Sequence, residues 1–195
     1  MTDLEAALRQ LVADLHLIEA SYALVGGLAV SIRAEPRLTR DADVAVSVKD
    51  DVQAETVIRQ LIERGYRPGT TIEHETTRRL AAIRLTHSER PATVVDLLFA
   101  SSGVEPEIVN QAEELEILPG LVVPVATCGH LIAMKLLARD DRNRPADYDD
   151  LLALAGVANE QDFSQASAIL KLIMDRGYNR GRDLETGLEE LRSRT

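Results

Sequence analysis

Two aspartates in the first quarter of the chain have the residue type and the spacing of metal ligands. Asp41 and Asp43 are separated by one alanine and lead into an apolar run at 44–48 that is rich in β-branched residues. Side chains alternate between the two faces of a strand, so both carboxylates are expected to point the same way. Carboxylates on one face repel each other unless a cation lies between them, and all-oxygen sites suit Mg²⁺. The pair therefore predicts a magnesium site.

Two glycines that precede the aspartates are expected to bind phosphate. Gly26 and Gly27 follow a short apolar strand expected over 22–25 and lead into a helix expected over 28–34. Backbone N–H groups at a helix N-terminus favour phosphate, and glycine lets the backbone approach a ligand closely. A phosphate site and a carboxylate pair on neighbouring strands predict a site for a nucleoside triphosphate. The alternative is a tight turn followed by a solvated strand end.

A third carboxylate and a lysine lie in apolar segments further along the chain. Asp96 is the only charged residue of a strand expected over 93–99. Burying an unpaired carboxylate is costly, so Asp96 should face a metal or another cation, the alternative being hydrogen bonds to backbone. Lys135 lies in a mostly apolar helix, and Arg139, four residues on, is expected on the same face. The alternative for Lys135 is a side chain that extends to the solvent.

Composition and charge restrict the class of protein. The 195 residues are 45% apolar and 28% charged, which is typical of a soluble globular chain. Without a membrane-helix window or a signal peptide, and with a single cysteine, a cytoplasmic protein that does not contact membranes is expected. A net charge of −10 argues against a general nucleic-acid binder. Positive charge is local instead, at Arg33, Arg37, Arg40, Arg78, Arg79, Arg139, Arg142 and Arg144.

Hydrophobic periodicity predicts an α/β (α+β) fold. Residues 1–125 are expected to form a mixed-sheet head, and residues 126–195 a helical region packed on it. The polar stretch 66–79, which contains Pro68 and Gly69, is expected to be a loop or an irregular hairpin. The other expected strands are 80–86, 93–99, 115–118 and 121–125, and the other expected helices are 4–20, 50–64, 105–112, 127–139, 146–155, 162–176 and 183–193.

The glycine and aspartate motifs together resemble the first motif of the DNA polymerase β-like nucleotidyltransferase superfamily. The stretch RLTRDAD at 37–43 is similar to the R-x-T-x-D-x-D of the AbiEii/AbiGii toxin family, which includes the MenT toxins. A second motif of that family resembles 135–139 followed by 147–151. The chain departs from it at Ala146, where the family often has lysine, and in the register of the arginines.

The resemblance implies an activity and its partners. It implies a nucleotidyltransferase toxin of a type IV-like toxin–antitoxin pair, with two Mg²⁺ ions, a nucleoside triphosphate as donor and a cognate antitoxin. In the best-matching relatives the donor is a pyrimidine triphosphate and the acceptor is the 3′ end of tRNA, so translation would be blocked. An acceptor hydroxyl attacks the α-phosphate and pyrophosphate leaves.

The resemblance also implies a role for each candidate residue. The metal ligands would be Asp41, Asp43 and Asp96, which with Lys135 form the catalytic set; the nucleotide would be bound by Gly26, Gly27, Arg40, Lys135 and Arg139; Asp147 and Asp150 would orient Lys135 or an arginine; and RNA would be bound by Arg33, Arg37, Arg78 and Arg79.

Two other functions stay open at this point. One is the same chemistry on a small molecule, as in aminoglycoside nucleotidyltransferases, or on a protein hydroxyl. A basic rim would indicate RNA, whereas an acidic cleft would suit a cationic drug. The other is an inactive nucleotidyltransferase fold that serves as a binding subunit or an antitoxin. Three mutually repelling carboxylates argue against the inactive form.

Overall fold

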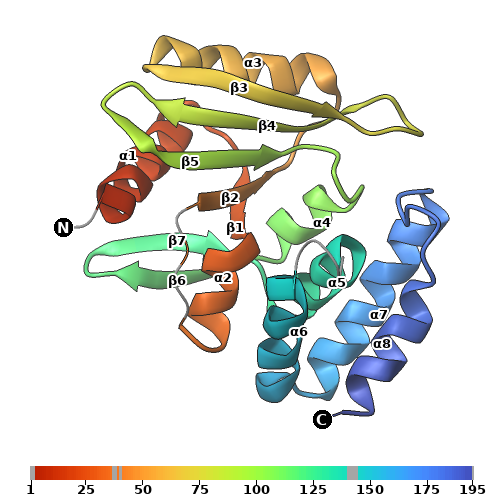
Figure 1. Cartoon of the computed structure of the whole chain (residues 1–195). Helices are drawn as coiled ribbons and strands as arrows, with labels where there is room; N and C mark the ends of the chain where they lie inside the picture. The colour runs from red at the N-terminus through yellow and green to blue at the C-terminus, as the bar shows by residue number, and fades with distance from the viewer. Residues whose placement is uncertain (1–2, 37–38, 40, 140–144, 195) are drawn as a thin grey trace.

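A mixed seven-stranded sheet with a group of C-terminal helices forms the part of the chain that the computed structural model describes, residues 3–36, 39, 41–139 and 145–194 (Figure 1). The elements in chain order are α1 (Asp3–Leu17), β1 (Tyr22–Val25), α2 (Gly26–Arg33), β2 (Asp41–Val46), α3 (Asp51–Glu63), β3 (Tyr66–Glu73), β4 (Leu80–His87), β5 (Arg90–Leu98), α4 (Glu105–Asn110), β6 (Glu113–Leu118), β7 (Leu121–Val125), α5 (Cys128–Ala138), α6 (Pro145–Val157), α7 (Glu160–Asp175) and α8 (Leu184–Arg192).

The strand order places the candidate residues side by side. The sheet runs β3-β4-β5-β2-β1-β7-β6, with β2 antiparallel to β1 and parallel to β5. In this register Asp43 lies opposite Val25 on one neighbour and opposite Asp96 on the other. The predicted mixed α/β fold is confirmed. The pairing of β2 with β5 brings the strand that contains Asp41 and Asp43 next to the strand that contains Asp96.

The segment expected to be a loop or an irregular hairpin at 66–79 is instead largely a strand. β3 occupies Tyr66–Glu73 at the edge of the sheet, and every one of its side chains after Tyr66 is exposed. Such a strand shows no hydrophobic alternation, which is why the sequence pattern did not reveal it. Pro68 is accommodated because an edge strand can do without one N–H donor, and the pairing with β4 is irregular between Pro68 and Thr71.

The hydrophobic core joins the sheet to the helices. Leu61 of α3, Leu97 of β5, Leu131 of α5 and Ile173 of α7 all belong to one cluster and are at most 1% exposed. This one cluster contains residues from both predicted regions, 1–125 and 126–195. The boundary between the two regions stays a prediction. In the described residues, no helix is long and apolar enough to cross a membrane.

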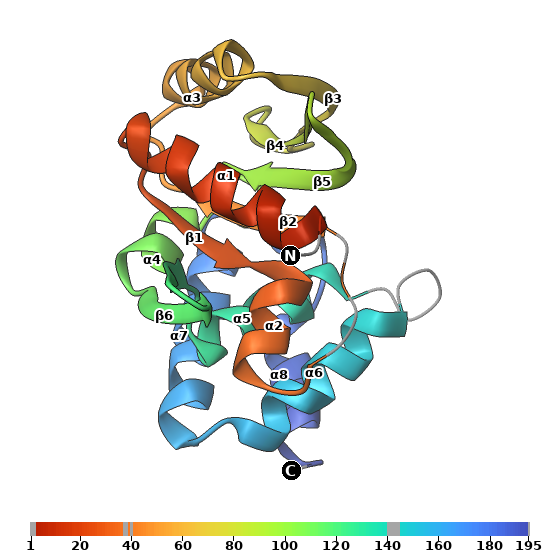
Figure 2. The ribbon, with the colours of Figure 1, turned by 90° about the vertical axis from the view of Figure 1, so that its left-hand side faces the viewer.

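The C-terminal helices gather at one end of the molecule. In Figures 1 and 2, α5, α6, α7 and α8 lie below the half of the sheet that contains β3, β4 and β5. The β3–β4 turn and the α7–α8 loop are joined by a ring contact between His74 and Tyr178, whose centroids lie 4.2 Å apart. The C-terminal helices therefore lie next to the part of the sheet whose strands contain the carboxylates.

Candidate active site

The carboxylate of Asp43 lies against the backbone at the start of α2. Gly26 has a φ of +64°, and a Cβ added there would lie 1.9 Å from Oδ2 of Asp43. The backbone N–H of Gly27 donates a hydrogen bond to the same carboxylate. Gly26 is therefore required at this position for two reasons, its backbone conformation and the close approach of Asp43. One of the N–H groups predicted to bind phosphate is used by the chain itself.

Asp43 is at the centre of a cluster of like charges. Burial, and then the charge of Asp96, raise the pKa of Asp43 from its ordinary 3.8 to about 6, with a smaller contribution from Asp41. The charge of Lys135 and the hydrogen bond from Gly27 act in the opposite direction. The predicted same-face arrangement of Asp41 and Asp43 on β2 agrees with their partial exposure, with Ala42 buried between them. A nearby cation would relieve this repulsion.

Arg84 on β4 binds Asp96, and sequence analysis missed it. Its Nε donates to Oδ1 of Asp96 at 2.9 Å and its Nη2 donates to Oδ2 at 2.7 Å. Hydrogen bonds to Asp96, and then the charge of that carboxylate, raise the pKa of Arg84, and Asp41 and Asp43 contribute to the same shift. Arg84 is the only charged residue of the apolar stretch 80–86. A lone charge in an apolar strand is the signal that identified Asp96, and the same signal would have identified Arg84.

Lys135 projects from α5 into a pair of carboxylates from α6. Its Nζ lies 2.7 Å from Oδ1 of Asp147 and 2.7 Å from Oδ2 of Asp150, and all three residues are buried. Asp147 and Asp150 share a helix face, as their i and i+3 spacing requires. The structure thus pairs these two aspartates with Lys135, and their predicted role in orienting it stays a prediction. A lysine ammonium has three donors, so two carboxylates do not use all of them.

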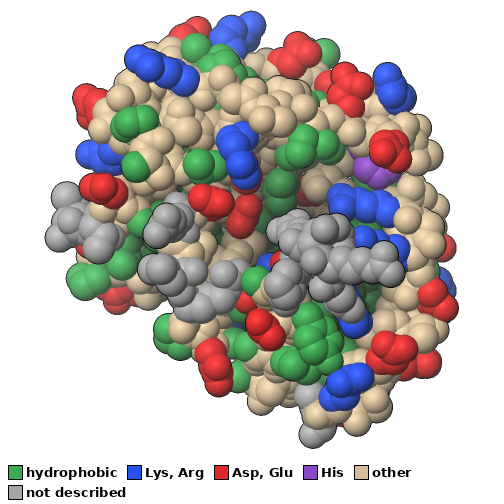
Figure 3. All heavy atoms as spheres, viewed as in Figure 1, with side chains coloured by type: hydrophobic (Ala, Val, Ile, Leu, Met, Phe, Trp, Pro, Cys, Tyr) green, Lys and Arg blue, Asp and Glu red, His purple; other side chains and the backbone are tan. Residues whose placement is uncertain are grey.

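A large cavity brings these groups together. Its volume is about 1040 Å³, and it lies between the sheet and the C-terminal region. The titratable residues that line it are Asp43, Glu73, His74, Glu75, Arg84, Asp96, Lys135, Asp147 and Arg180, and Gly26 at the start of α2 also lines it. Figure 3 shows the molecule hollowed at the centre of one face, with acidic and basic side chains around the hollow.

Two predicted ligand-binding arginines have structural roles outside this cavity. Arg33, expected to bind RNA, donates to the carbonyl oxygens of Val125 and Ala126 and to the carboxylate of Glu113, at 2.5 to 3.1 Å. Its guanidinium therefore links α2 to the end of β7. Arg139, expected to bind nucleotide, lies beyond the last residue of α5, and its guanidinium carbon stands 4.9 Å above the ring centre of Tyr148. Lys135 lines the cavity, whereas Arg139 is not among its lining residues.

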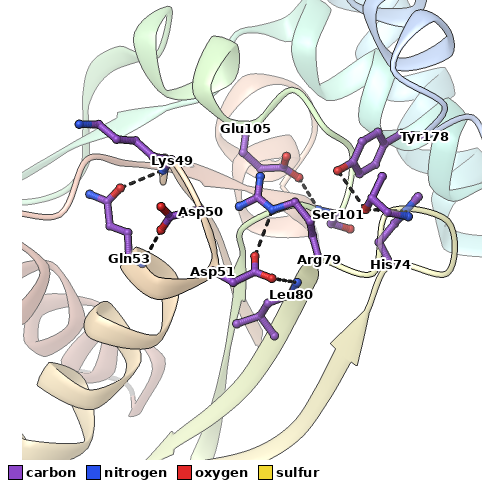
Figure 4. A network of polar contacts seen from close by, with 11 residues as sticks. Lys49, Asp50, Asp51, Gln53, His74, Arg79, Leu80, Ser101, Glu105 and Tyr178 are labelled. Atoms are coloured by element: carbon purple, nitrogen blue, oxygen red, sulfur yellow. Dashed lines mark hydrogen bonds and ion pairs between the residues drawn. The ribbon is translucent and has the colours of Figure 1, made fainter.

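The other predicted arginines differ in accessibility. Arg79 donates from Nε to Oδ1 of Asp51, at 3.1 Å, and helps to hold β4 against the start of α3 (Figure 4). Arg78 is exposed, has a φ of +58° and forms a loose ion pair of 3.6 Å with Glu73. Of the predicted RNA-binding residues that are described, only Arg78 is open to a partner of that size. Arg37, Arg40, Arg142 and Arg144 lie outside the described residues.

The carboxylates fit a divalent cation by their donor chemistry. Hard oxygen ligands suit Mg²⁺, and Asp43 and Asp96 face each other on paired strands with Asp41 on the same strand as Asp43. In the described part of the chain, however, no three acidic, histidine or cysteine side chains converge closely enough to form a metal centre. The assignment of Asp41, Asp43 and Asp96 as metal ligands therefore stays a prediction, and in this structure both oxygens of Asp96 accept hydrogen bonds from Arg84.

Comparison with known proteins identifies the family. The model of the family described as "Nucleotidyl transferase AbiEii toxin, Type IV TA system" matches residues 8–194. The chain belongs to this AbiEii toxin family. It is therefore a nucleotidyltransferase-family enzyme of a type IV toxin–antitoxin system, which implies a nucleotide substrate and an antitoxin. The resemblance noted in the sequence is confirmed. No curated protein is significantly similar to this AbiEii chain.

Two solved structures share the fold of this chain at low sequence identity, and a third matches it more weakly. An antigenic nucleotidyltransferase-like protein from Paracoccidioides brasiliensis is 17% identical, with a TM-score of 0.56 over 96% of this chain and 92% of that one. The lincosamide antibiotic adenylyltransferase LnuA, bound to lincomycin, is 18% identical, with a TM-score of 0.51 over 79% and 98%. The toxin MenT4 from Mycobacterium tuberculosis is 16% identical, with a TM-score of 0.34 over 98% and 95%.

The first prediction concerns the contact between Gly26 and Asp43. We expect Gly26→Ala to reduce nucleotidyl transfer by about 100-fold or more, because its methyl group displaces the Asp43 carboxylate, and an ångström-scale shift of a catalytic group has an effect of this size. Gly120→Ala is the matched control, since Gly120 has a similar φ of +71° with nothing within 4 Å of an added Cβ. Both variants should lose about 1 kcal/mol of stability from the backbone conformation alone. Equal transfer rates for the two variants would contradict this assignment.

The second prediction concerns the stability of the metal-free protein. The folded pKa of Asp43 is raised, so ionising this carboxylate disfavours the folded state as pH rises from about 4 to 6. We expect Asp43→Asn, which keeps an acceptor for the Gly27 N–H, to increase the free energy of unfolding at pH 8 by at most about 3 kcal/mol. The difference should vanish near pH 4. Urea unfolding in EDTA at both pH values measures it, and a variant less stable than the wild type at pH 8 would refute it.

Proposed function

We propose that this AbiEii chain transfers a nucleoside monophosphate from a pyrimidine triphosphate to the 3′-terminal hydroxyl of tRNA, and so blocks translation in the cytoplasm. The observation that carries the proposal is the single cavity that joins Asp43, Asp96, Lys135 and the start of α2. These are the parts that nucleotidyl transfer needs: carboxylates at the reacting phosphate, and cationic and N–H groups for the triphosphate.

The triphosphate has cationic partners on two sides of this cavity. Lys135 is held by Asp147 and Asp150, so its ammonium is fixed in place and has a donor left for a phosphate oxygen. Arg84 on the sheet and Arg180 on the α7–α8 loop line the same space. Arg180 adds positive charge that sequence analysis did not assign to the site, since the loop lies far from the motifs in sequence.

The reaction then follows from the roles of the carboxylates. The acceptor hydroxyl attacks the α-phosphorus, a new P–O bond forms, and the bond to the leaving pyrophosphate breaks. Asp96 accepts the proton of the hydroxyl. Asp41, Asp43 and Asp96 would hold Mg²⁺, which supplies charge neutralisation at the phosphates. Lys135 stabilises the negative charge that develops on the phosphate oxygens.

The RNA acceptor rests on the family resemblance and on a smaller basic surface than the sequence predicted. Arg33 and Arg79 are engaged with the chain itself, which leaves Arg78 at the β3–β4 turn, beside the cavity wall formed by Glu73 to Thr76. Arg37 and Arg40, which come shortly before Asp41 in sequence, lie outside the described residues. A few phosphate contacts would give RNA binding that weakens with salt.

A small-molecule acceptor is the second candidate. Glu73 and Glu75 line the cavity, and acidic groups would favour a cationic acceptor over RNA. The LnuA structure shares the fold and is described as an antibiotic adenylyltransferase. This alternative uses the same carboxylates and the same lysine, so only the acceptor distinguishes it.

The third prediction tests the donor and the acceptor together. The protein is incubated with Mg²⁺, total RNA and each of the four labelled nucleoside triphosphates in turn. We expect label in RNA of tRNA size with a pyrimidine triphosphate, and none after periodate treatment of the RNA, which destroys the 3′-terminal diol. Asp43→Asn should reduce labelling by at least about 100-fold. Label in no RNA with any triphosphate would refute the acceptor, and transfer to an aminoglycoside or lincosamide would support the second candidate.

The fourth prediction separates the two neighbouring arginines. We expect Arg78→Glu to weaken RNA labelling and to reduce its dependence on salt concentration, because one phosphate contact is lost. Arg79→Glu should instead lower the melting temperature, because its negative charge would face Asp51. Equal RNA affinity of the Arg78→Glu variant and the wild type at 50 and 200 mM salt would remove Arg78 from the RNA surface.

A further inference from the structure

Arg84 binds both oxygens of Asp96, so a metal ion that approaches this carboxylate meets a guanidinium already bound to it. The two hydrogen bonds are parallel, at 2.9 and 2.7 Å, and each uses a different carboxylate oxygen. The side chain of Asp96 is 18% exposed and that of Arg84 is 50% exposed. Arg84 therefore reaches in from the open side of the cavity and is free to leave along the same path.

The charges around this pair explain why it forms. Asp96 lies opposite Asp43 in the parallel register of β2 and β5, and Arg84 lies opposite Asp96 in the antiparallel register of β4 and β5. Three neighbouring strands thus present aspartate, aspartate and arginine in a row. The guanidinium neutralises the carboxylate that would otherwise repel Asp43 most strongly. A divalent cation at the same place would have the same effect.

We propose that Arg84 and the metal ion compete for Asp96, and that Arg84 moves to the phosphates of the bound triphosphate when the metal takes the carboxylate. This inference rests on the proposed nucleotidyl transfer. A planar guanidinium with two parallel donors fits a phosphate as well as a carboxylate, so the side chain exchanges one bidentate partner for another. Arg84 is then a positioning residue in the free protein and a substrate-binding residue in the complex.

The exchange links metal binding to substrate binding. Without a triphosphate, the cavity offers Arg84 no phosphate as a second bidentate partner, and metal binding must displace it from Asp96 at a cost. With a triphosphate bound, the displaced guanidinium gains a phosphate partner, and the third carboxylate becomes available both to a metal ion and to the proton of the acceptor hydroxyl. The metal is therefore bound tightly only together with the nucleotide.

The test measures Mn²⁺ binding by the nucleotide-free protein, from the electron paramagnetic resonance signal of free Mn²⁺. We expect Arg84→Ala to bind Mn²⁺ about tenfold more tightly than the wild type, since a half-exposed charge-assisted pair no longer opposes binding. Arg84→Lys should lie between them, because lysine keeps the charge without the paired donors. Arg67→Ala is the matched control, since it removes an exposed arginine from β3 that does not line the cavity.

A second pair of measurements assigns the effect to Asp96 and to the phosphates. The gain in Mn²⁺ affinity should disappear in Arg84→Ala/Asp96→Asn relative to Asp96→Asn alone, which separates competition for this carboxylate from a general change in charge. In transfer assays, Arg84→Ala should raise the KM for the triphosphate by about tenfold or more.

Three outcomes would overturn the proposal: unchanged Mn²⁺ affinity in Arg84→Ala, an equal gain in Arg67→Ala, or a gain that persists without Asp96. An unchanged KM would remove the movement to the phosphates. A wild type that transfers nucleotide but shows no effect of Arg84 on Mn²⁺ refutes this inference alone. A clear effect of Arg84 in a protein that transfers no nucleotide refutes the proposed function instead.

Discussion

The close contact between the backbone of Gly26 and the carboxylate of Asp43 is the constraint on which the site depends. The carboxylate can approach α2 only because the residue there has no Cβ, and it is fixed by the N–H of Gly27. This contact sets how β1, α2 and β2 meet, and it directs one carboxylate into the cavity. The parallel pairing of β2 with β5 then determines where Asp96 lies, because Asp96 is opposite Asp43 in the sheet. Any residue larger than glycine would separate the helix start from the carboxylate cluster.

Charge balance is the second theme of the structure. Concentrated negative charge is unfavourable in a partly buried site, and the free protein offsets it with two cations on different elements. Arg84 pairs with Asp96 from the sheet, and Lys135 pairs with Asp147 and Asp150 from the helices. Each of the two cations balances carboxylates in the free protein. Because both line the same cavity, both can also contact an anionic substrate there. A net charge of −10 is thus compatible with binding a triphosphate, because positive charge is concentrated where it is needed.

The C-terminal helices complete the site as well as the core. α5 contributes Lys135, α6 contributes Asp147 and Asp150, which pair with that lysine, and the α7–α8 loop contributes Arg180 to the cavity lining. The contact between His74 and Tyr178 ties that loop to the β3–β4 turn. Membership of the AbiEii family over residues 8–194 agrees with this arrangement, since the family match includes the helices and is not confined to the sheet.

Much of this could be predicted from the sequence, where a local pattern has a local physical cause. The spacing of Asp41 and Asp43, the glycines after an apolar strand and the lone charge in the strand of Asp96 are local features, and most helices followed from their periodicity. Other assignments depended on distant partners. Arg33 and Arg79 look like free surface cations in sequence, but tertiary contacts with Ala126 and Asp51 engage them. Arg139 lies one helical turn after Lys135, but its guanidinium stands over the ring of Tyr148 and does not line the cavity. Strand order decided that Arg84 meets Asp96, because side chains on separate strands become neighbours only when the sheet assembles.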